Sequence, residues 1–297
     1  CSAIGSTRSG RAGAGAGGWS AMIPAQYSEP IMTAWPTLFR AIRRPLAGWW
    51  QAAGSLCQVC GDWQDAPLCA TCRRVHGAVA ARCRCCGTRR IGLDPVCRDC
   101  ARLPPAFERT VVAVDYAYPW DGLIGRFKYG QACELAGPLA ALLAEAVSAA
   151  LDDGQVARPD LIVPVPLAPS RWRERGYNQA WELARRVARA LDRPADPDVV
   201  ERIIATPHQA GLSRQARLHN LRGAFLVPPA ARARLAGTRV ALVDDVMTTG
   251  ATAAELALTL RRAGVAEVQC WMLARTRPGA DLRDDAGHHV PHRPGPP

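Results

Sequence analysis

The sequence predicts an α/β fold in which a parallel sheet carries helices on both faces, preceded by a small metal-binding module. Three observations lead to this prediction. From about Pro104 onward, short apolar runs typical of buried strands alternate with longer stretches of helical periodicity. The apolar run Val240–Val243 leads into a Thr/Gly-rich turn and then a helical stretch, which is a strand–turn–helix unit. Ahead of this region, eight cysteines form four Cys-x-x-Cys pairs.

Length and composition are consistent with this organisation. The chain has 297 residues, of which 48% are hydrophobic, so it can bury the core of one sizeable domain beside a smaller module. Its formal net charge of +11 favours anionic partners such as nucleotides, pyrophosphate or nucleic acid. No apolar run reaches the length of about eighteen residues that a membrane helix needs, so we expect no membrane span.

Four segments are expected along the chain. Residues 1–55 begin with a Gly/Ala/Ser/Arg-rich stretch and are expected to be disordered or weakly structured. Residues 56–103 hold the cysteine pairs, and residues 104–277 form the α/β domain. Residues 278–297 contain Pro, Gly, Asp and His without periodicity and are expected to form a disordered tail. No export signal is evident, so we expect a cytoplasmic protein.

The strands and helices of the α/β domain follow from its apolar patterns. We expect strands at Thr110–Tyr118, Leu161–Val165, Val240–Val243 and Val268–Leu273, and helices at Leu135–Leu151 and Gln179–Leu191. Asn178 is suited to cap the start of the second helix, and Gly264 to end the helix that follows the Thr/Gly turn. Ligands of such sheets bind beyond the carboxyl ends of the strands, where the candidate site residues follow.

The cysteine pairs have the spacing of structural zinc sites. Gaps of eight and ten residues separate the pairs, and a glycine follows the first and third pairs, where a tight knuckle must aim backbone N–H groups at thiolates. A module of about fifty residues with few large aliphatic side chains needs a metal to fold. A disulfide framework is the alternative, which the lack of an export signal disfavours. We therefore expect two zinc ions, bound by Cys57, Cys60, Cys69, Cys72, Cys83, Cys86, Cys97 and Cys100.

How the pairs combine is open at this point. Sequential pairing gives two zinc ribbons in tandem, whereas interleaved pairing gives a RING-like cross-brace. The hairpin-sized gaps favour sequential pairing. His76 and Cys85 are possible substitute ligands, but each lies outside a Cys-x-x-Cys pair. Four thiolates leave no open coordination position, so the zinc is expected to be structural rather than catalytic.

The strand–turn–helix unit predicts a sugar-phosphate site. In the turn, converging backbone N–H groups, threonine hydroxyls and the helix dipole favour an anion. Asp244 and Asp245 would repel a phosphate, but they suit ribose hydroxyls or Mg²⁺. Capping of the turn is the alternative, although a cap needs only one carboxylate. The unit resembles the phosphoribosyl-pyrophosphate motif of type I phosphoribosyltransferases. This resemblance implies ligand contacts from Asp244, Asp245, Val246, Met247, Thr248, Thr249, Gly250, Ala251 and Thr252.

Basic residues in two other segments are candidates for pyrophosphate contacts. Arg171 and Arg175 follow the strand ending near Val165, and arginine forks suit pyrophosphate oxygens, although a solvated basic loop is the alternative. Lys128 is the single lysine of the chain, which suggests a role for a compact ammonium or a chance survival. The polar segment 206–220 is either a mobile lid or a plain surface connection.

Taken together, these features resemble the ComF family of bacterial competence proteins. The order of elements carries the resemblance: the cysteine pairs come first and the phosphoribosyl motif last. The further matching residues are Phe127-Lys128-Tyr129, Pro164-Val165-Pro166-Leu167, Arg175-Gly176-Tyr177-Asn178-Gln179, Gln209, Arg217 and Asn220. Cys85 departs from the family pattern, and both tails lie outside the resemblance. Family members pair a double zinc ribbon with a type I phosphoribosyltransferase domain and are implicated in uptake of transforming DNA.

The resemblance implies binding of phosphoribosyl pyrophosphate with Mg²⁺ and a role in uptake or processing of transforming DNA. As an enzyme, the protein would transfer the phosphoribosyl group, a pentosyl transfer, to an unknown acceptor. Asp244 and Asp245 would hold the ribose hydroxyls, directly or through Mg²⁺, and stabilise positive charge on the ring. The alternative is a non-catalytic sensor of phosphoribosyl pyrophosphate that binds single-stranded DNA and works with the competence machinery. The sequence leaves the acceptor and the oligomeric state open.

Overall fold

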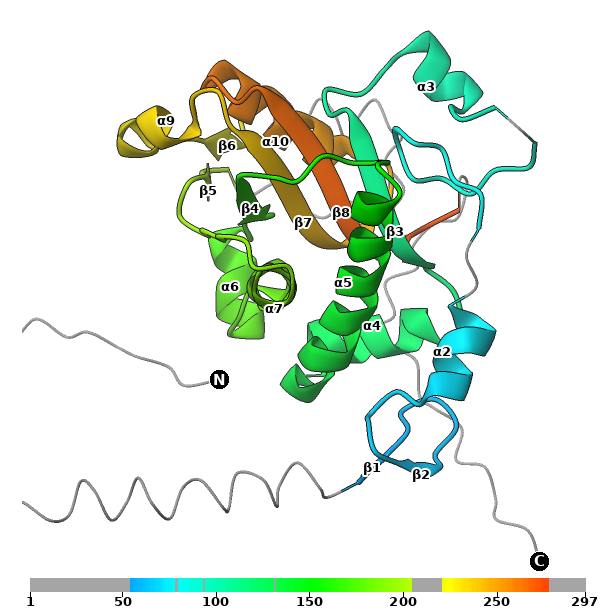
Figure 1. The fold of residues 1–297 in the computed structure, drawn as a ribbon. Coiled ribbons are helices and arrows are strands. Elements are labelled where there is room, and N and C mark those ends of the chain that lie inside the picture. Colours follow the sequence, from blue (N-terminus) through cyan, green and yellow to red (C-terminus); the bar gives the residue numbers. More distant parts are fainter. Residues whose placement is uncertain (1–53, 78–79, 93, 131, 205–220, 278–297) are drawn as a thin grey trace, which may run out of the picture. The chain divides into compact units, whose positions relative to one another are not determined.

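The computed structural model describes residues 54–77, 80–92, 94–130, 132–204 and 221–277 (Figure 1). The chain divides between Ser55 and Leu56, and the fold below is that of the unit that begins at Leu56. The segments expected to be disordered, 1–55 and 278–297, lie almost entirely outside the described residues. The expected lid at 206–220, with Gln209, Arg217 and Asn220, lies outside them as well.

A four-stranded parallel sheet forms the centre of this unit, with the strand order β3-β8-β7-β4. Its strands are β3 (Arg109–Asp115), β4 (Leu161–Pro164), β7 (Arg239–Met247) and β8 (Glu267–Arg275). The inner strands β7 and β8 are buried along most of their length, which explains their near-continuous apolar sequences. The predicted parallel sheet is therefore confirmed.

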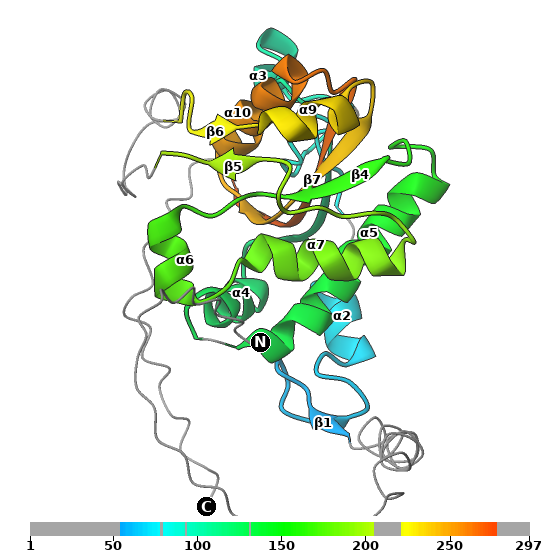
Figure 2. The ribbon, with the colours of Figure 1, turned by 90° about the vertical axis from the view of Figure 1, so that its left-hand side faces the viewer.

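Helices cover both faces of the sheet (Figure 2). One face carries α4 (Trp120–Tyr129), α5 (Ala136–Asp152) and α7 (Gln179–Ala190), which share a hydrophobic core with the sheet. The other face carries α9 (Pro229–Leu235) and α10 (Ala251–Arg262), which form a second core. The three layers confirm the predicted α/β class with helices on both faces.

Short elements complete the described structure. The cysteine-rich segment contains β1 (Ser55–Leu56), β2 (Trp63–Gln64), α2 (Ala70–His76) and α3 (Arg98–Arg102). The α/β part adds the 3-10 turn η1 (Cys133–Leu135), α6 (Pro169–Arg175) and the antiparallel pair β5 (Glu201–Arg202) and β6 (Phe225–Leu226).

One stretch of the described chain, Cys133–Asp152, is long and apolar enough to cross a membrane by length and composition. Half of it is buried inside the protein. The side chains of Leu139, Leu143 and Val147 are fully buried in the core that α5 shares with β3, β8 and α7. Packing against the sheet therefore accounts for the apolar character of this helix.

Several expected boundaries differ from the observed ones. Strand β7 does not stop at Val243 but continues to Met247, because it pairs with β8 as far as Met247 opposite Arg275. Asp244 and Asp245 therefore belong to the strand and not to the turn after it. The helix signals are confirmed: the Asn178 side chain accepts hydrogen bonds from the first backbone N–H groups of α7, and Gly264 follows the end of α10 with φ +97°.

Candidate functional site

The eight paired cysteines form two groups of four. The thiol sulfurs of Cys57, Cys60, Cys69 and Cys72 lie within 4.8 Å of one another, and so do those of Cys83, Cys86, Cys97 and Cys100. The favoured sequential pairing is therefore confirmed. His76 and Cys85 belong to neither group. We call these sets the first and the second four-cysteine group.

Backbone N–H groups point at the sulfurs, as the knuckle argument predicted. The N–H of Cys69 donates to the Cys57 Sγ at 3.4 Å, and that of Cys97 donates to the Cys83 Sγ at 3.2 Å. Such bonds stabilise thiolates, and four thiolates at this separation fit a tetrahedral zinc ion. Both groups could hold zinc, with no coordination position left for a substrate.

The predicted phosphate loop lies between β7 and α10. Gly250 has φ +78°, a left-handed conformation that glycine adopts readily, and the chain enters the helix from there. The Ala251 N–H donates to the Thr249 hydroxyl at 3.3 Å. A hollow of ≈ 30 Å³ opens at this point. It is lined by Asp244, Val246, Met247, Thr248, Gly250, Ala251, Thr252, Ala253 and Met272. Seven of the nine predicted motif residues therefore line one hollow at a helix N-terminus, and the other two, Asp245 and Thr249, do not.

The two adjacent carboxylates have different environments. The Asp245 Oδ1 lies 3.0 Å from the Lys128 Nζ, and both side chains are largely buried. Burial would lower the pKa of Lys128, but the carboxylates of Asp245 and Asp244 outweigh it and raise this pKa above its ordinary value. Burial, helped by the charge of Asp245, raises the pKa of Asp244 to about 7. Lys128 thus neutralises Asp245, while Asp244 is short of compensating positive charge.

The motifs around Lys128 and Arg175 come together beside these carboxylates. The Tyr177 hydroxyl donates to the Phe127 carbonyl, and the Gln179 Nε2 donates to the Lys128 carbonyl at 3.4 Å. The Arg175 guanidinium lies 4.8 Å from the centre of the Tyr129 ring. The end of α4, which carries Lys128, is therefore fixed by the start of α7.

The two predicted arginines are placed differently. Arg175 Nη1 donates to the Gln179 Oε1 at 3.2 Å, and its positive charge acts on Asp244. Its Nε is buried and has no hydrogen-bond partner among the described residues. Arg171 instead forms an ion pair with Glu174 at 2.9 Å. Arg175 is therefore the arginine that the fold presents beside the carboxylates.

The structure adds one basic residue, Arg202, that the sequence did not identify as part of the site. Burial lowers the pKa of Arg202, and so does the nearby charge of Arg171, whereas Asp244 opposes them. Arg202 in β5 is therefore an electrostatic neighbour of Asp244. No sequence signal could have found it, because β5 has two residues and its position depends on pairing with β6.

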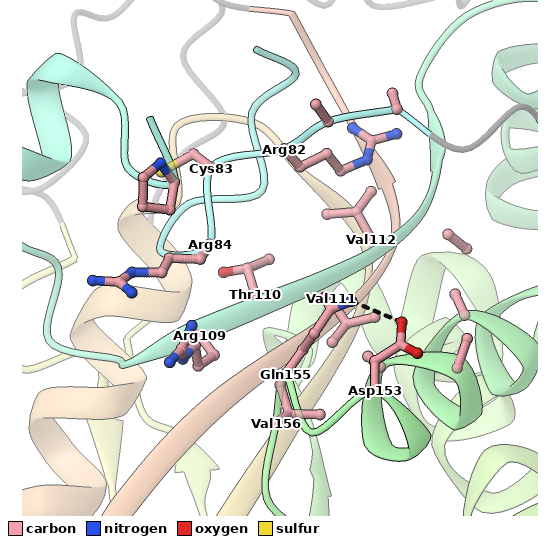
Figure 3. Close-up of a pocket in the computed structure, with 17 residues that line it drawn as sticks. Arg82, Cys83, Arg84, Arg109, Thr110, Val111, Val112, Asp153, Gln155 and Val156 are labelled. Carbon is pink, nitrogen blue, oxygen red and sulfur yellow. Dashed lines mark hydrogen bonds between the residues drawn. The ribbon is translucent and has the colours of Figure 1, made fainter. Parts of the chain in front are cut away.

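A larger cavity of ≈ 630 Å³ lies elsewhere, between the segment that carries the second four-cysteine group, β3 and the end of α5 (Figure 3). Alanine and valine side chains form much of its wall, and Arg84, Arg109, Asp153 and Gln155 also line it. Of the predicted site residues, only Cys83 is part of its lining. The lining of this cavity therefore includes no residue of the β7–α10 loop.

No family model matches the chain. Competence protein F of Haemophilus influenzae is 38% identical over 208 residues, which cover 70% of this chain and 90% of the relative. The DNA utilization protein YhgH of Escherichia coli K12 is 36% identical over 227 residues, covering 74% of this chain and 97% of the relative. The YhgH protein of Salmonella typhi is 35% identical over 209 residues, with coverages of 70% and 90%.

Solved structures give weaker similarity. The glutamine phosphoribosylpyrophosphate amidotransferase of B. subtilis aligns with a TM-score of 0.31 and 21% identity over 46% of this chain and 26% of that chain. A purine phosphoribosyltransferase of Pyrococcus horikoshii aligns with a TM-score of 0.30 and 16% identity over 46% of this chain and 83% of that chain. At such scores the similarity adds nothing to what the strand order itself shows.

Proposed function

Because this chain belongs to the ComF family, with competence protein F and the DNA utilization protein YhgH, we propose that it binds phosphoribosyl pyrophosphate with Mg²⁺ in the cytoplasm and acts in uptake or processing of transforming DNA. One observation carries the ligand assignment. Asp244 lines the same hollow at the end of β7 as the phosphate-loop residues Thr248, Gly250, Ala251 and Thr252. A carboxylate for the ribose hydroxyls and a helix N-terminus for the 5-phosphate are thus adjacent.

The environments of the two carboxylates support separate roles. Asp245 is paired with Lys128, so its charge is already compensated. Burial and the charge of Asp245 raise the pKa of Asp244, so a cation beside Asp244 would stabilise its ionised form, which makes it the better candidate to face a cation. Mg²⁺ held near Asp244 would supply positive charge to the pyrophosphate group. Asp244 would then be ionised on ligand binding and release its proton to solvent.

The basic residues fit the pyrophosphate end of the same ligand. Arg175 has a buried Nε without a hydrogen-bond partner among the described residues, and its charge already acts on Asp244. A phosphate oxygen beside it would accept that hydrogen bond. Arg171 and Arg202 add positive charge nearby. The hydroxyl-binding and the phosphate-binding groups thus converge on one ligand.

In a transfer reaction, the bond between ribose C1 and the pyrophosphate oxygen breaks, and its electron pair leaves with pyrophosphate. The nucleophilic atom of the acceptor forms the new bond to C1 and releases its proton to solvent. Positive charge develops on the ribose ring between these events, and the Asp244 carboxylate would stabilise it electrostatically. The protein contributes positioning and charge, with no covalent intermediate on the enzyme.

A second candidate is a sensor that binds phosphoribosyl pyrophosphate without transferring it and binds single-stranded DNA. Trp63 in the first cysteine segment is 69% exposed, and aromatic side chains in such positions stack on bases. Arg84, beside the second four-cysteine group, is exposed, whereas Arg82 and Arg89 form ion pairs with Asp115. If electrostatic contacts dominate, DNA affinity will fall steeply with salt.

Calorimetric titration of the zinc-loaded protein with phosphoribosyl pyrophosphate and Mg²⁺ tests the ligand assignment. We expect saturable binding that is lost in the double variant Asp244→Ala plus Asp245→Ala. The control is Asp152→Ala plus Asp153→Ala, which removes two adjacent carboxylates at the exposed end of α5 and should bind normally. Absence of binding to the unmodified protein would overturn the proposal.

Pyrophosphate release separates the two candidate functions. An enzyme releases pyrophosphate only when an acceptor is added, so nucleobases and single-stranded DNA should be offered in turn. Acceptor-dependent release that disappears in Asp244→Ala supports the transferase. Tight ligand binding, salt-sensitive DNA binding and no release with any acceptor support the sensor.

A further inference from the structure

Arg275, at the end of β8, joins the phosphate loop to the second four-cysteine group. Its side chain is 7% exposed. On one side, its Nη1 donates to the Met247 carbonyl at 3.0 Å and also to the Thr248 carbonyl. On the other side, its Nε donates to the carbonyl of Cys86 at 2.9 Å. One buried guanidinium therefore holds backbone oxygens from two segments that are distant in sequence.

The contacts of Arg275 with the loop carbonyls determine the direction in which the backbone N–H groups of the loop point. A trans peptide unit is planar, and its C=O and N–H point in opposite directions. Holding the Met247 and Thr248 carbonyls toward Arg275 therefore directs the N–H groups of Thr248 and Thr249 away from it. Met247 and Thr248 line the hollow of the predicted phosphate loop. The guanidinium thus orients the peptide units that would bind a phosphate.

The contact to Cys86 extends this arrangement to the metal-binding knuckle. Cys86 is a member of the second four-cysteine group, and its carbonyl position depends on the fold of the knuckle around the four sulfurs. Gly87, the next residue, fits closely against β3: a Cβ atom there would lie 2.5 Å from the Val112 side chain. The knuckle that receives the Arg275 Nε is therefore held tightly on the sheet.

We propose that Arg275 is a positioning residue that couples metal binding at the second four-cysteine group to the phosphate-binding shape of the β7–α10 loop. The ligand side of this inference rests on the proposed function. The metal side rests on the contacts of Arg275 alone. Since coupling between two sites is reciprocal, metal in the second group favours the ligand, and the ligand favours retention of that metal.

Amide hydrogen exchange tests the positioning role without any ligand. In zinc-loaded protein, we expect the N–H groups of Thr248 and Thr249 to exchange about tenfold faster or more in Arg275→Gln, because bonds from a charged donor are lost. Arg275→Lys keeps the charge but cannot hold both segments at once, so it should also exchange faster. Arg239→Gln, at the opposite end of β7, is the control. Unchanged exchange in both Arg275 variants overturns the inference.

Calorimetry with phosphoribosyl pyrophosphate and Mg²⁺ tests the ligand side. We expect affinity to fall by about ten- to hundredfold in Arg275→Gln and less in Arg275→Lys, with two zinc ions still present. Equal affinity in the unmodified protein and both variants overturns the inference and leaves the proposed function intact. If the unmodified protein takes up no ligand, the proposed function and the ligand side fail together, and the exchange experiment still decides whether Arg275 positions the loop.

Zinc release to a chromogenic chelator, driven by a thiol reagent, tests the reciprocal effect. Saturating phosphoribosyl pyrophosphate should slow release of one zinc ion several-fold and leave the other unchanged. In Arg275→Gln, this protection should disappear. Protection that persists in Arg275→Gln, or that acts equally on both zinc ions, overturns coupling through Arg275.

Discussion

The two four-cysteine groups have the same ligands and similar spacing, but they contact different parts of the α/β domain. The first group leads into α2, and this helix contacts other helices. The Trp120 Nε1 donates to the His76 carbonyl at 2.9 Å, and Arg73 forms an ion pair with Glu145. The second group contacts the sheet itself. The Thr110 N–H donates to the Arg84 carbonyl at 2.9 Å, and Arg275 donates to the Cys86 carbonyl.

The glycine that follows each knuckle shows the same difference. Gly61 and Gly87 both have positive φ, so the two turns are locally alike. A Cβ atom at Gly61 would meet nothing within 4 Å, whereas at Gly87 it would meet Val112 and Thr110. Similar motifs therefore have different surroundings. The first four-cysteine group contacts helices, and the second packs against the sheet and is linked to the phosphate loop.

Loss of one zinc ligand from each group should give the largest effect. We expect Cys69→Ser and Cys97→Ser each to lower the free energy of unfolding by about 3 kcal/mol or more, because a structural metal is lost. Cys97→Ser should cost about 1–2 kcal/mol more, since the bonds to β3 and Arg275 weaken as well. Urea unfolding and zinc content measure this. Equal losses would contradict the distinction between the groups.

A methyl group at each knuckle glycine isolates packing from metal binding. Gly61→Ala and Gly87→Ala both force alanine into a left-handed conformation, at about 1 kcal/mol each. Gly87→Ala should cost about 2 kcal/mol more, because it also overlaps Val112 and Thr110. Thermal unfolding of the two zinc-loaded variants gives the difference directly. A Gly61→Ala that is as damaging as Gly87→Ala would show that the close packing is unimportant.

The pH dependence of ligand binding should depend on the loop and not on either knuckle. The pKa of Asp244 is raised to about 7, so the free protein increasingly holds a proton there as pH falls below 7. If the ionised form binds the Mg²⁺ complex, affinity falls about tenfold between pH 8 and pH 6. Calorimetry at several pH values measures this. Asp244→Asn reports the titration of the ligand itself, and Gly61→Ala should keep the unmodified profile.

Loss of an ion pair should give the smallest effect on stability. As in the other variants, the loss should be larger beside the second four-cysteine group than beside the first. Asp115 lies 2.7 Å from Arg82 and 3.2 Å from Arg89, and its side chain is 18% exposed. The pair between Arg73 and Glu145 is more exposed, with Glu145 at 59%. We expect Asp115→Asn to cost about 1 kcal/mol and Glu145→Gln less than about 0.5 kcal/mol. Urea unfolding at low and high salt tests this, and the reverse order would contradict it.

Much of the fold was predictable because its signals are local. The alternating apolar runs predicted the central strands, and the Asn178 cap and Gly264 placed helix ends correctly. The gaps between the cysteine pairs indicated sequential grouping, which the structure has. These features depend on neighbours in the sequence, so propensity and spacing are sufficient to find them.

The remaining features depend on contacts between distant segments. Strand β7 extends past Val243 because β8 lies beside it, and no local pattern marks that extension. Arg202 and Arg275 are two of many arginines, and only the fold brings one near Asp244 and the other to the loop. Lys128 was marked by being the single lysine, but its partner Asp245 could not be identified from spacing.

The segment that carries the second four-cysteine group also covers part of an edge strand of the sheet. Strand β3 is at one margin of the sheet, where unpaired backbone groups could recruit a strand from another chain. There, the Thr110 N–H donates a hydrogen bond to the Arg84 carbonyl. At the opposite margin, Pro194 and Asp196 bond to Ile162 of β4 in the same way. Metal loss from the second group would uncover the β3 margin, so demetallated protein should aggregate through its sheet before it unfolds completely.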